Sequence, residues 1–215
     1  ITHSDIDLFA KYCGVSFWLR VGDRTFCLTP APDFDKNIKY SSVLNGSMSY
    51  ISAEFGNFKT TAAVSVPPDE NGEIRTITVE YGGSRPVDCE LICFFEPVLD
   101  TRRSYESHKA FSKLLLEFTN GSDHMCVRRR PRGDSPEKYL YLKCSKICGF
   151  EISESKVFGR GDTLILKSAN GQFSRAASFD ACVCAAVPLH LEPQSKNKVI
   201  YTLAAALTEQ DAQGA

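Results

Sequence analysis

The sequence predicts an all-β protein, a large antiparallel β-sandwich with few short helices. Three observations favour this fold class: apolar residues alternate with polar ones, Gly, Pro, Asn and Asp turns separate the alternating segments, and helical patterns are confined to the two ends. About ten strands at this spacing are typical of a sandwich or barrel rather than of βαβ units. With 215 residues, 43% of them hydrophobic, the chain can bury a sizeable core as one domain.

The clearest strand is the segment 76–81, in which Ile77, Val79 and Tyr81 share one face. The preceding segment 60–66 is a second strand, and the turn-forming sequence PPDENG at 67–72 joins the two into a hairpin. Segment 87–99 has apolar residues on both faces in its second half, where Ile92 and Phe94 fill the second face. This pattern predicts a strand that is buried on both sides.

Seven further strands complete the predicted sandwich. The two segments of helical character are DIDLFAKY at 5–12 and LTEQDAQGA at 207–215. The further strands are expected at 47–58, 111–118, 125–130, 139–144, 152–158, 181–189 and 199–206.

Charge and composition exclude several classes of partner and compartment. A formal net charge of −1 gives no reason to expect nucleic acid or an anionic membrane as a partner. No apolar stretch approaches the roughly 20 residues that cross a bilayer, and the first residues lack the order of a signal peptide, so we expect a cytoplasmic protein. Because the sequence opens at Ile1 without Met, we expect a piece of a longer protein.

The nine cysteines are expected to be buried, reduced and free of metal. Two C-x3-C spacings, Cys89/Cys93 and Cys144/Cys148, lack the C-x2-C geometry and second ligand pair of a structural zinc site. On a strand, such an even separation places both sulfurs on one face. We therefore predict neither a disulfide framework nor a metal or cofactor site.

Two basic segments, one histidine and the separate Arg160 are the candidate binding groups. The segment RRRPR at 128–132 could grip phosphate or carboxylate, but a solvated strand end is the simpler interpretation. Arg102, Arg103 and His108 lie in TRRSYESHK at 101–109, which we expect to be a binding loop between two strands. Arg160 lies in FGRGD at 158–162, where a turn with glycines at positive φ fits better than a phosphate loop.

Several segments, taken in order, resemble the N-terminal β-supersandwich domain of family-94 glycoside phosphorylases, formerly glycosyltransferase family 36, and of cyclic β-1,2-glucan synthases. The resemblance covers most of the chain, and five motifs in the right order carry it. Three residues depart from the family pattern: Lys109 and Ala181 each stand in place of Pro, and Gln194 stands in place of Gly. The matching segments are 17–32, 62–99, 108–118 with RRRPR, 157–164 and 179–193.

The resemblance implies a galactose-mutarotase-like supersandwich over residues 1–205, followed at 206–215 by the start of a linker to a helical catalytic barrel that this chain lacks. The domain would be non-catalytic, would support the sugar site of an enzyme acting on β-linked glucose oligomers, and would often build a homodimer interface. Its partners would be a β-glucan oligosaccharide and the catalytic domain of its own parent chain. We expect sugar-site contacts from Arg102, Arg103, His108 and Arg160.

Two other classes of function remain open. An independent mutarotase-like sugar epimerase would need a histidine and a carboxylate within reach of a sugar ring oxygen and anomeric hydroxyl, and His108 is the candidate acid. A stand-alone carbohydrate-binding module would be marked by exposed aromatic platforms.

Overall fold

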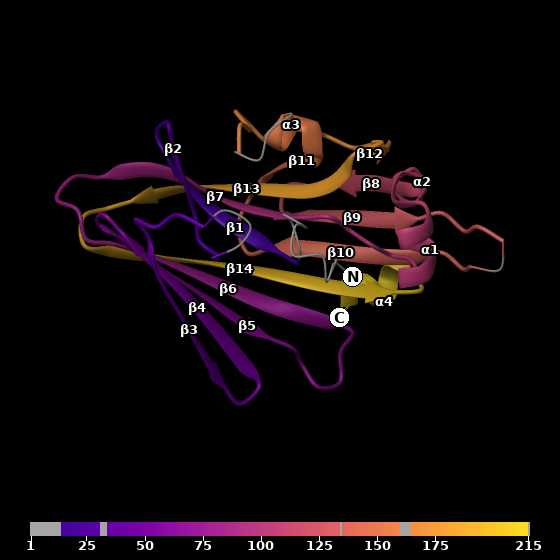
Figure 1. Cartoon of the computed structure of the whole chain (residues 1–215), viewed down its shortest axis with the longest axis horizontal. Helices are drawn as coiled ribbons and strands as arrows, with labels where there is room; N and C mark the ends of the chain where they lie inside the picture. Colours follow the sequence, from indigo (N-terminus) through magenta and orange to yellow (C-terminus); the bar gives the residue numbers. More distant parts are fainter. Residues whose placement is uncertain (1–13, 31–33, 134, 160–163, 215) are drawn as a thin grey trace.

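The computed structural model describes residues 14–30, 34–133, 135–159 and 164–214, and it contains two antiparallel sheets packed face to face (Figure 1). This arrangement confirms the predicted all-β sandwich. The five-stranded sheet has the order β11 (Gly149–Ser153), β13 (Ala181–Leu191), β7 (Val87–Phe95), β1 (Ser16–Val21), β2 (Arg24–Cys27). The nine-stranded sheet has the order β12 (Ser174–Ala176), β8 (Leu116–Asn120), β9 (His124–Arg129), β10 (Lys138–Cys144), β14 (Ser195–Ala206), β6 (Gly72–Tyr81), β5 (Phe58–Ser65), β4 (Met48–Phe55), β3 (Lys39–Asn45).

The central strand of the small sheet is β7, and it is buried on both faces as its sequence predicts. Leu91, Cys93 and Phe95 point into the core between the sheets. Ile92 and Phe94 point to the opposite face, where they join a second apolar cluster covered by the short helix α3 (Glu154–Phe158). A strand with apolar residues at consecutive positions therefore marks the place where three layers are stacked.

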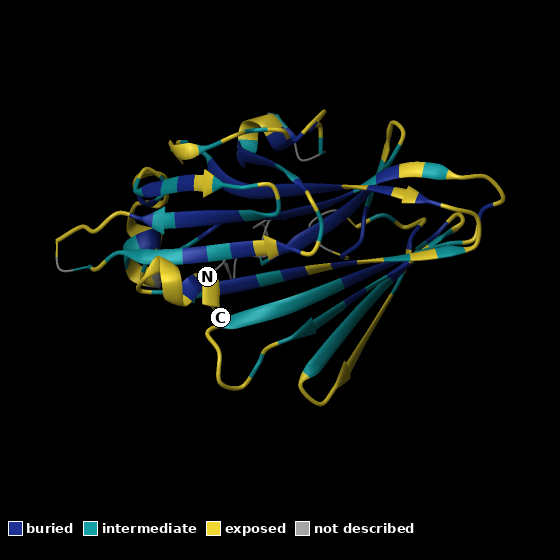
Figure 2. Ribbon diagram, turned by 180° about the vertical axis from the view of Figure 1, so that it is seen from behind, coloured by how far each residue is buried: buried dark blue, intermediate teal, exposed yellow. Residues whose placement is uncertain are grey.

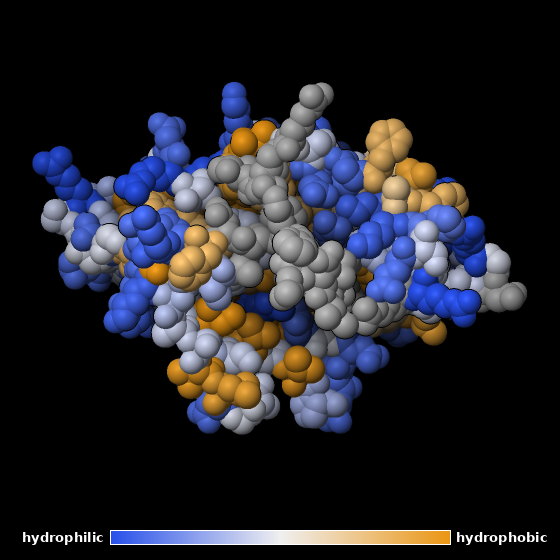
Figure 3. Space-filling view, in the orientation of Figure 1, coloured by the Kyte–Doolittle hydropathy of each residue, from blue (hydrophilic) through white to orange (hydrophobic). Residues whose placement is uncertain are grey.

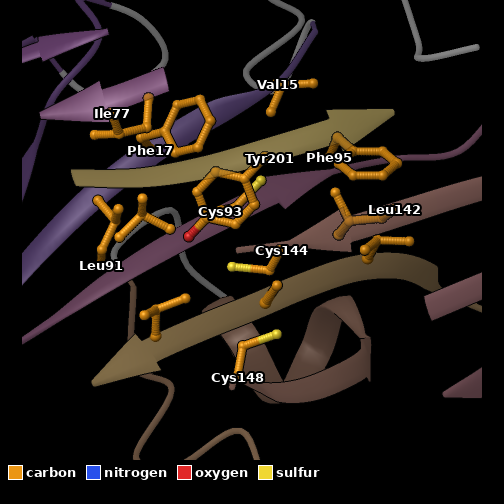
Figure 4. Packing of buried hydrophobic residues seen from close by; sticks show 14 of the residues in the cluster. Val15, Phe17, Ile77, Leu91, Cys93, Phe95, Leu142, Cys144, Cys148 and Tyr201 are labelled. Carbon is orange, nitrogen blue, oxygen red and sulfur yellow. The ribbon is translucent and has the colours of Figure 1, made fainter. Parts of the chain in front are cut away.

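The main core lies between the sheets, and its centre is shown in Figure 4. The ring of Tyr201, on β14, lies 5.5 Å from the ring of Phe17, on β1, so the two sheets meet through large side chains. In Figure 4, Cys93 lies beside the same tyrosine, and Cys144 and Cys148 follow in the same core cluster on one side of it. The alternating side chains of each strand thus place apolar residues on the face that points into the core, and the cysteines act as small core residues.

The larger sheet extends beyond the smaller one. Strands β3, β4 and β5 spread away from the rest of the molecule as a fan, and most of their residues are half-buried or exposed (Figures 1 and 2). In Figure 3, hydrophobic side chains gather over this part of the molecule. Val43 and Leu44 on the edge strand β3 are among the exposed large hydrophobic residues.

Three of the predicted strand segments have a different structure. Segment 111–118 begins inside helix α2 (Lys109–Lys113) and only then enters β8, and segment 152–158 leaves β11 for α3. Segment 47–58 is interrupted at Gly56, whose φ of 53° starts the tight turn between β4 and β5. The loop expected at 101–109 contains another short helix, α1 (Arg102–Ser107).

Of the two terminal helical patterns, only the closing one lies in the described part of the chain. The closing segment forms α4 (Glu209–Gly214), which packs on β10 and β14 and confirms that prediction. The opening segment 5–12 lies outside the described residues. Within the part of the chain that the structure describes, none of the helices has the length and apolar character needed to span a membrane.

Candidate functional site

The two basic segments singled out in the sequence meet at one end of the sandwich, here called the helical end. It consists of α1, α2 and the loop 130–137 between β9 and β10, and α4 lies at the same end of the molecule (Figure 1). The strands β7, β9 and β14 all finish here, so their last residues position the side chains of this end.

Helix α1 starts where Asp100 and Thr101 cap its first turn. The Thr101 side chain accepts a hydrogen bond from the Ser104 amide at 3.3 Å, and the Asp100 carboxylate accepts bonds from the Thr101 amide and the Ser104 hydroxyl, both at 2.8 Å. Thr is favoured at the N-cap, the position of Thr101, because its side chain accepts a bond from an amide that has no partner within the helix. The sequence Asp-Thr-x-x-Ser was therefore the signal for a helix that the sequence analysis missed.

A buried ion pair joins α1 to the end of β9. The Arg129 guanidinium lies 2.8 Å from the Asp100 carboxylate, and the two side chains are only 3% and 6% exposed. Arg129 also donates to the Ser135 hydroxyl at 3.2 Å, which ties Ser135 to the end of β9. Burial raises the pKa of Asp100, but bonds from Ser104, Thr101 and Arg129 together hold it below its usual range.

Lys113 forms a second ion-pair cluster at this end, between two carboxylates. Its ammonium group lies 3.1 Å from Glu96, at the end of β7, and 3.2 Å from Glu154, the first residue of α3. Tyr105 of α1 adds a bond from its hydroxyl to Glu96 at 3.4 Å. Burial raises the pKa of Glu154, and nearby Glu96 adds to the rise that Lys113 opposes. Lys113 of α2 thus ties the end of β7 to the start of α3, and Tyr105 adds α1 to the cluster.

The surface of the helical end carries cations above these buried pairs. Arg132 stacks on the ring of Phe111 at 4.4 Å, which brings the RRRPR segment onto α2. Arg130 donates to the Leu114 carbonyl oxygen at 2.8 Å. The Lys109 ammonium lies 6.0 Å from the centre of the Tyr105 ring. The prediction that RRRPR is a solvated strand end is therefore wrong for Arg129, which faces inward and is buried, and the alternation along β9 explains why its two neighbours remain outside.

The four predicted sugar contacts are described to different extents. Arg103 and His108 are exposed at the helical end, and His108 ends α1 and precedes α2. Arg102 begins α1, but its side chain is outside the described part of the chain. Arg160 also lies outside the described residues. Gly159, just before it, has the positive φ of 67° expected for this turn.

Histidine–carboxylate pairs occur away from the helical end. His190 on β13 lies 2.6 Å from Asp88 and 3.2 Å from Glu192, and all three side chains are more than half exposed to solvent. These carboxylates, Asp88 first, raise the pKa of His190. A second pair joins His124 to Asp123 at 2.9 Å. These geometries do not favour His108 as the acid of an epimerase.

The cysteines that the structure describes are all buried. Burial raises the pKa of Cys89 and of Cys126 to about 12, so both sulfurs remain protonated at neutral pH. Across the described ranges, no three His, Cys, Asp or Glu side chains are placed to hold a metal ion.

Comparison with known proteins identifies the domain type. The family model described as "Glycosyl hydrolase 94, supersandwich domain" matches residues 3–215. A search of curated proteins finds no match. Among solved structures, a bacterial glucoamylase complexed with acarbose has a TM-score of 0.60 at 10% identity, and the similarity covers 94% of this chain and 28% of that one.

Two further solved structures share the fold. A putative kojibiose phosphorylase from the human microbiome has a TM-score of 0.51 at 8% identity, covering 91% of this chain and 22% of that one. A polysaccharide lyase has a TM-score of 0.51 at 15% identity, covering 93% of this chain and 26% of that one. The chain thus spans about a quarter of the length of each of these proteins.

Proposed function

The chain belongs to the glycosyl hydrolase 94 supersandwich domain family, and from this premise we propose that it is the non-catalytic, carbohydrate-associated domain of a larger enzyme. That enzyme would be a glycoside phosphorylase or a glucan-synthesising glycosyltransferase related to the cyclic glucan synthases, acting on β-linked glucose oligomers. The domain would support the substrate site, and a helical catalytic domain following residue 215 would supply the chemistry.

One observation from the helical end carries the non-catalytic part of this proposal. The buried carboxylate of Asp100 pairs with Arg129, and the half-buried carboxylates of Glu96 and Glu154 share Lys113. Inverting phosphorolysis needs a carboxylic acid that faces the substrate and gives its proton to the leaving oxygen. The pKa of Glu154 is raised, as such an acid needs, but its half-buried carboxylate is paired with Lys113 at 3.2 Å. These carboxylates stabilise the fold through their pairs with Arg129 and Lys113. Other basic side chains, Arg103 and His108, remain exposed.

The exposed cations suggest how the domain supports a sugar site. Arg103 and His108 lie on the surface of the helical end, and guanidinium and imidazole groups donate hydrogen bonds to sugar hydroxyls or to phosphate. Helix α4 lies at the same end, so a domain that continues from it would lie close to these side chains. We propose Arg103 and His108, with Arg102 and Arg160, as edge contacts of the substrate.

The fan of the large sheet supports a role in dimer formation. Val43 and Leu44 are 60% and 77% exposed on β3, which is an edge strand with an unpaired side. Exposed apolar edge strands readily pair with another chain. We propose that this edge contributes to a homodimer. Size-exclusion chromatography with light scattering tests this by measuring whether the charged substitution Leu44→Lys lowers the molecular mass in solution.

The sugar contacts are tested in the longer enzyme that contains this chain. Arg103→Ala and His108→Ala should each lower kcat/KM for β-linked glucose oligomers about two- to tenfold, the range for one lost hydrogen bond. The melting temperature should stay within a few degrees, because exposed substitutions cost little stability. Lys198→Ala, an exposed change on β14, is the matched control. Parental kinetics in both variants would mean that this end only connects strands.

A further inference from the structure

The end of the sandwich opposite the helical end is a rigid assembly of three turns, here called the turn end. It comprises the β4–β5 turn at 56–57, the segment 81–86 and the β13–β14 turn at 192–194. The Gly82 amide donates to the Asn57 carbonyl oxygen at 2.8 Å, and the Gln194 side chain donates to the Gly82 carbonyl oxygen at 2.7 Å. These bonds connect three loops that are far apart in sequence, so the surface between them is preorganised for binding.

Two hollows adjoin at the turn end and share Gly56, Asn57 and Phe58 as their common wall. Their volumes are about 560 Å³ and 430 Å³, within the size range of small-molecule sites. The first hollow lies over β4, β5, β6 and the start of β14, and the second lies between the β1–β2 hairpin and the β4–β5 turn. A ligand longer than one ring could cross the shared wall and occupy both.

A row of aromatic rings runs along these hollows. Phe26 stacks on Phe55 with ring centres 4.4 Å apart, Phe55 lies 5.6 Å from Phe58, and Phe58 lies 4.9 Å from Tyr81. Phe58 and Tyr81 are half-buried and line the first hollow, whereas the Arg24 guanidinium lies 5.1 Å from the centre of the Phe26 ring and covers it. The electron-rich face of an aromatic ring attracts the weakly positive C–H groups on the face of a pyranose.

The polar groups around the rings balance in charge. In the first hollow Lys59 pairs with Glu54 at 3.1 Å, and Lys196 pairs with Glu80 at 2.8 Å. The second hollow contains one basic residue, Arg24, and one acidic residue, Asp35. Hydrogen-bonding groups without net charge suit an uncharged ligand with many hydroxyls better than an anion.

Gln194 holds an unusual backbone conformation at this place. Its φ of 56° lies in the left-handed region, which costs energy for any residue with a Cβ and which glycine adopts freely. The residue is nevertheless a glutamine, and its exposed side chain lines the first hollow. The side-chain nitrogen donates to the carbonyl oxygens of Gly82 and Gly83 at 2.7 and 3.4 Å, so the amide oxygen is the atom of this strained residue that could accept a bond from a ligand hydroxyl.

We propose that the turn end is a saccharide-binding site, which holds consecutive units of an oligosaccharide against Phe58 and Tyr81, with polar contacts from Asn57 and from the amide oxygen of Gln194. The choice of β-linked glucose as the sugar rests on the proposed function, whereas the site itself rests on the rings, the hollows and Gln194. The site lies at the other end of the strands from Arg103 and His108, so an oligosaccharide held here is separate from the proposed edge contacts.

The test is a titration of the ¹⁵N-labelled 215-residue chain with cellotetraose, β-1,2-linked glucotetraose and maltotetraose, followed by amide shifts. We expect a β-linked probe to shift the amides of Asn57, Phe58 and Gln194 in a saturable way. Gln194→Gly should weaken binding about two- to tenfold, the range for one lost hydrogen bond, while the melting temperature should change by only a few degrees, since glycine relieves the strained φ but loses the bond to Gly82. Phe58→Leu, which keeps an apolar side chain, should weaken binding tenfold or more.

The matched control is Phe179→Ala, which removes an exposed aromatic ring close to the start of β13, at the other end of that strand. It should bind like the parent chain. The site is refuted if no probe shifts the turn-end amides, or if Gln194→Gly and Phe58→Leu bind as tightly as the parent. Shifts confined to Arg103 and His108 would also refute it while leaving the proposed function intact, and catalytic turnover by the chain would refute the proposed function without bearing on this site.

Discussion

Replacing Asp100 by asparagine should destabilise the fold more than any exposed substitution at the helical end. The change removes the negative charge 2.8 Å from Arg129 but keeps the size and one acceptor oxygen of the side chain. Because both side chains are at most 6% exposed, the guanidinium would remain buried without its counter-ion. Breaking a buried pair on one side costs about 3–5 kcal/mol, so we expect a loss of that size for Asp100→Asn.

Urea unfolding, followed by fluorescence of the buried Trp18 and by far-UV circular dichroism, measures this loss. The control is Glu80→Gln, which breaks the exposed pair with Lys196, whose side chain is 63% exposed, and should cost less than about 1 kcal/mol. Replacing both buried partners, by Asp100→Leu and Arg129→Met together, should cost less than Asp100→Asn alone. If Asp100→Asn costs no more than Glu80→Gln, the ion pair does not organise this end.

The pH dependence of the same variant follows from the lowered pKa of Asp100. A carboxylate whose folded pKa lies below its unfolded value contributes stability above the unfolded pKa and loses it as the pH falls through the folded pKa. The gap in stability between the parent chain and Asp100→Asn should therefore be full at neutral pH and should shrink below about pH 4. A gap that is constant down to the folded pKa and below would contradict the assignment.

Three further predictions concern the core and the surface. Tyr201→Phe should raise the free energy of unfolding by about 1 kcal/mol, because the buried hydroxyl has no hydrogen-bond partner among the described residues, and a loss in urea unfolding would contradict this. Cys93 and Cys182 are fully buried, so mass mapping should find them alkylated only under unfolding conditions, and labelling in the native state would show the packing to be wrong. A double-mutant cycle on Arg132 and Phe111 should give about 0.5–1 kcal/mol of coupling, and additive single effects would exclude the stacking.

The sequence predicts the fold class well because apolar and polar residues alternate along a strand that has one buried face. Ile77 and Val79 face the core as predicted, and the doubly apolar segment of β7 is buried on both faces. The edge strand β3 was not predicted, because nearly all of its residues are exposed and no buried face imposes alternation. The start of α3 depends on Asp180, which accepts a bond from the Ser155 amide at 2.7 Å, and a cap that lies 25 residues away gives no local signal.

The candidate site is only partly predictable, because contacts between residues that are distant in sequence leave no local signal. The sequence marks Arg103, His108 and the RRRPR segment as basic, but it does not reveal that Arg132 stacks on Phe111 or that Arg129 is the buried member of the group. Those contacts join residues on separate strands and helices and exist only after the two sheets pack. The aromatic row of the turn end likewise joins four strands, so spacing along the chain does not indicate it.

The central claim, that this chain is a supporting domain and supplies no catalysis, is tested by its activity alone. The purified 215-residue chain is incubated with cellobiose, sophorose and longer β-linked glucose oligomers in the presence of phosphate, and sugar phosphate and transfer products are measured. General acid catalysis alone raises the reaction rate on the order of 10²–10⁴-fold. Because we propose that this chain supplies neither the acid nor the phosphate site, we expect no product above the blank. Product that scales with the amount of chain and survives repurification would contradict the supporting-domain account.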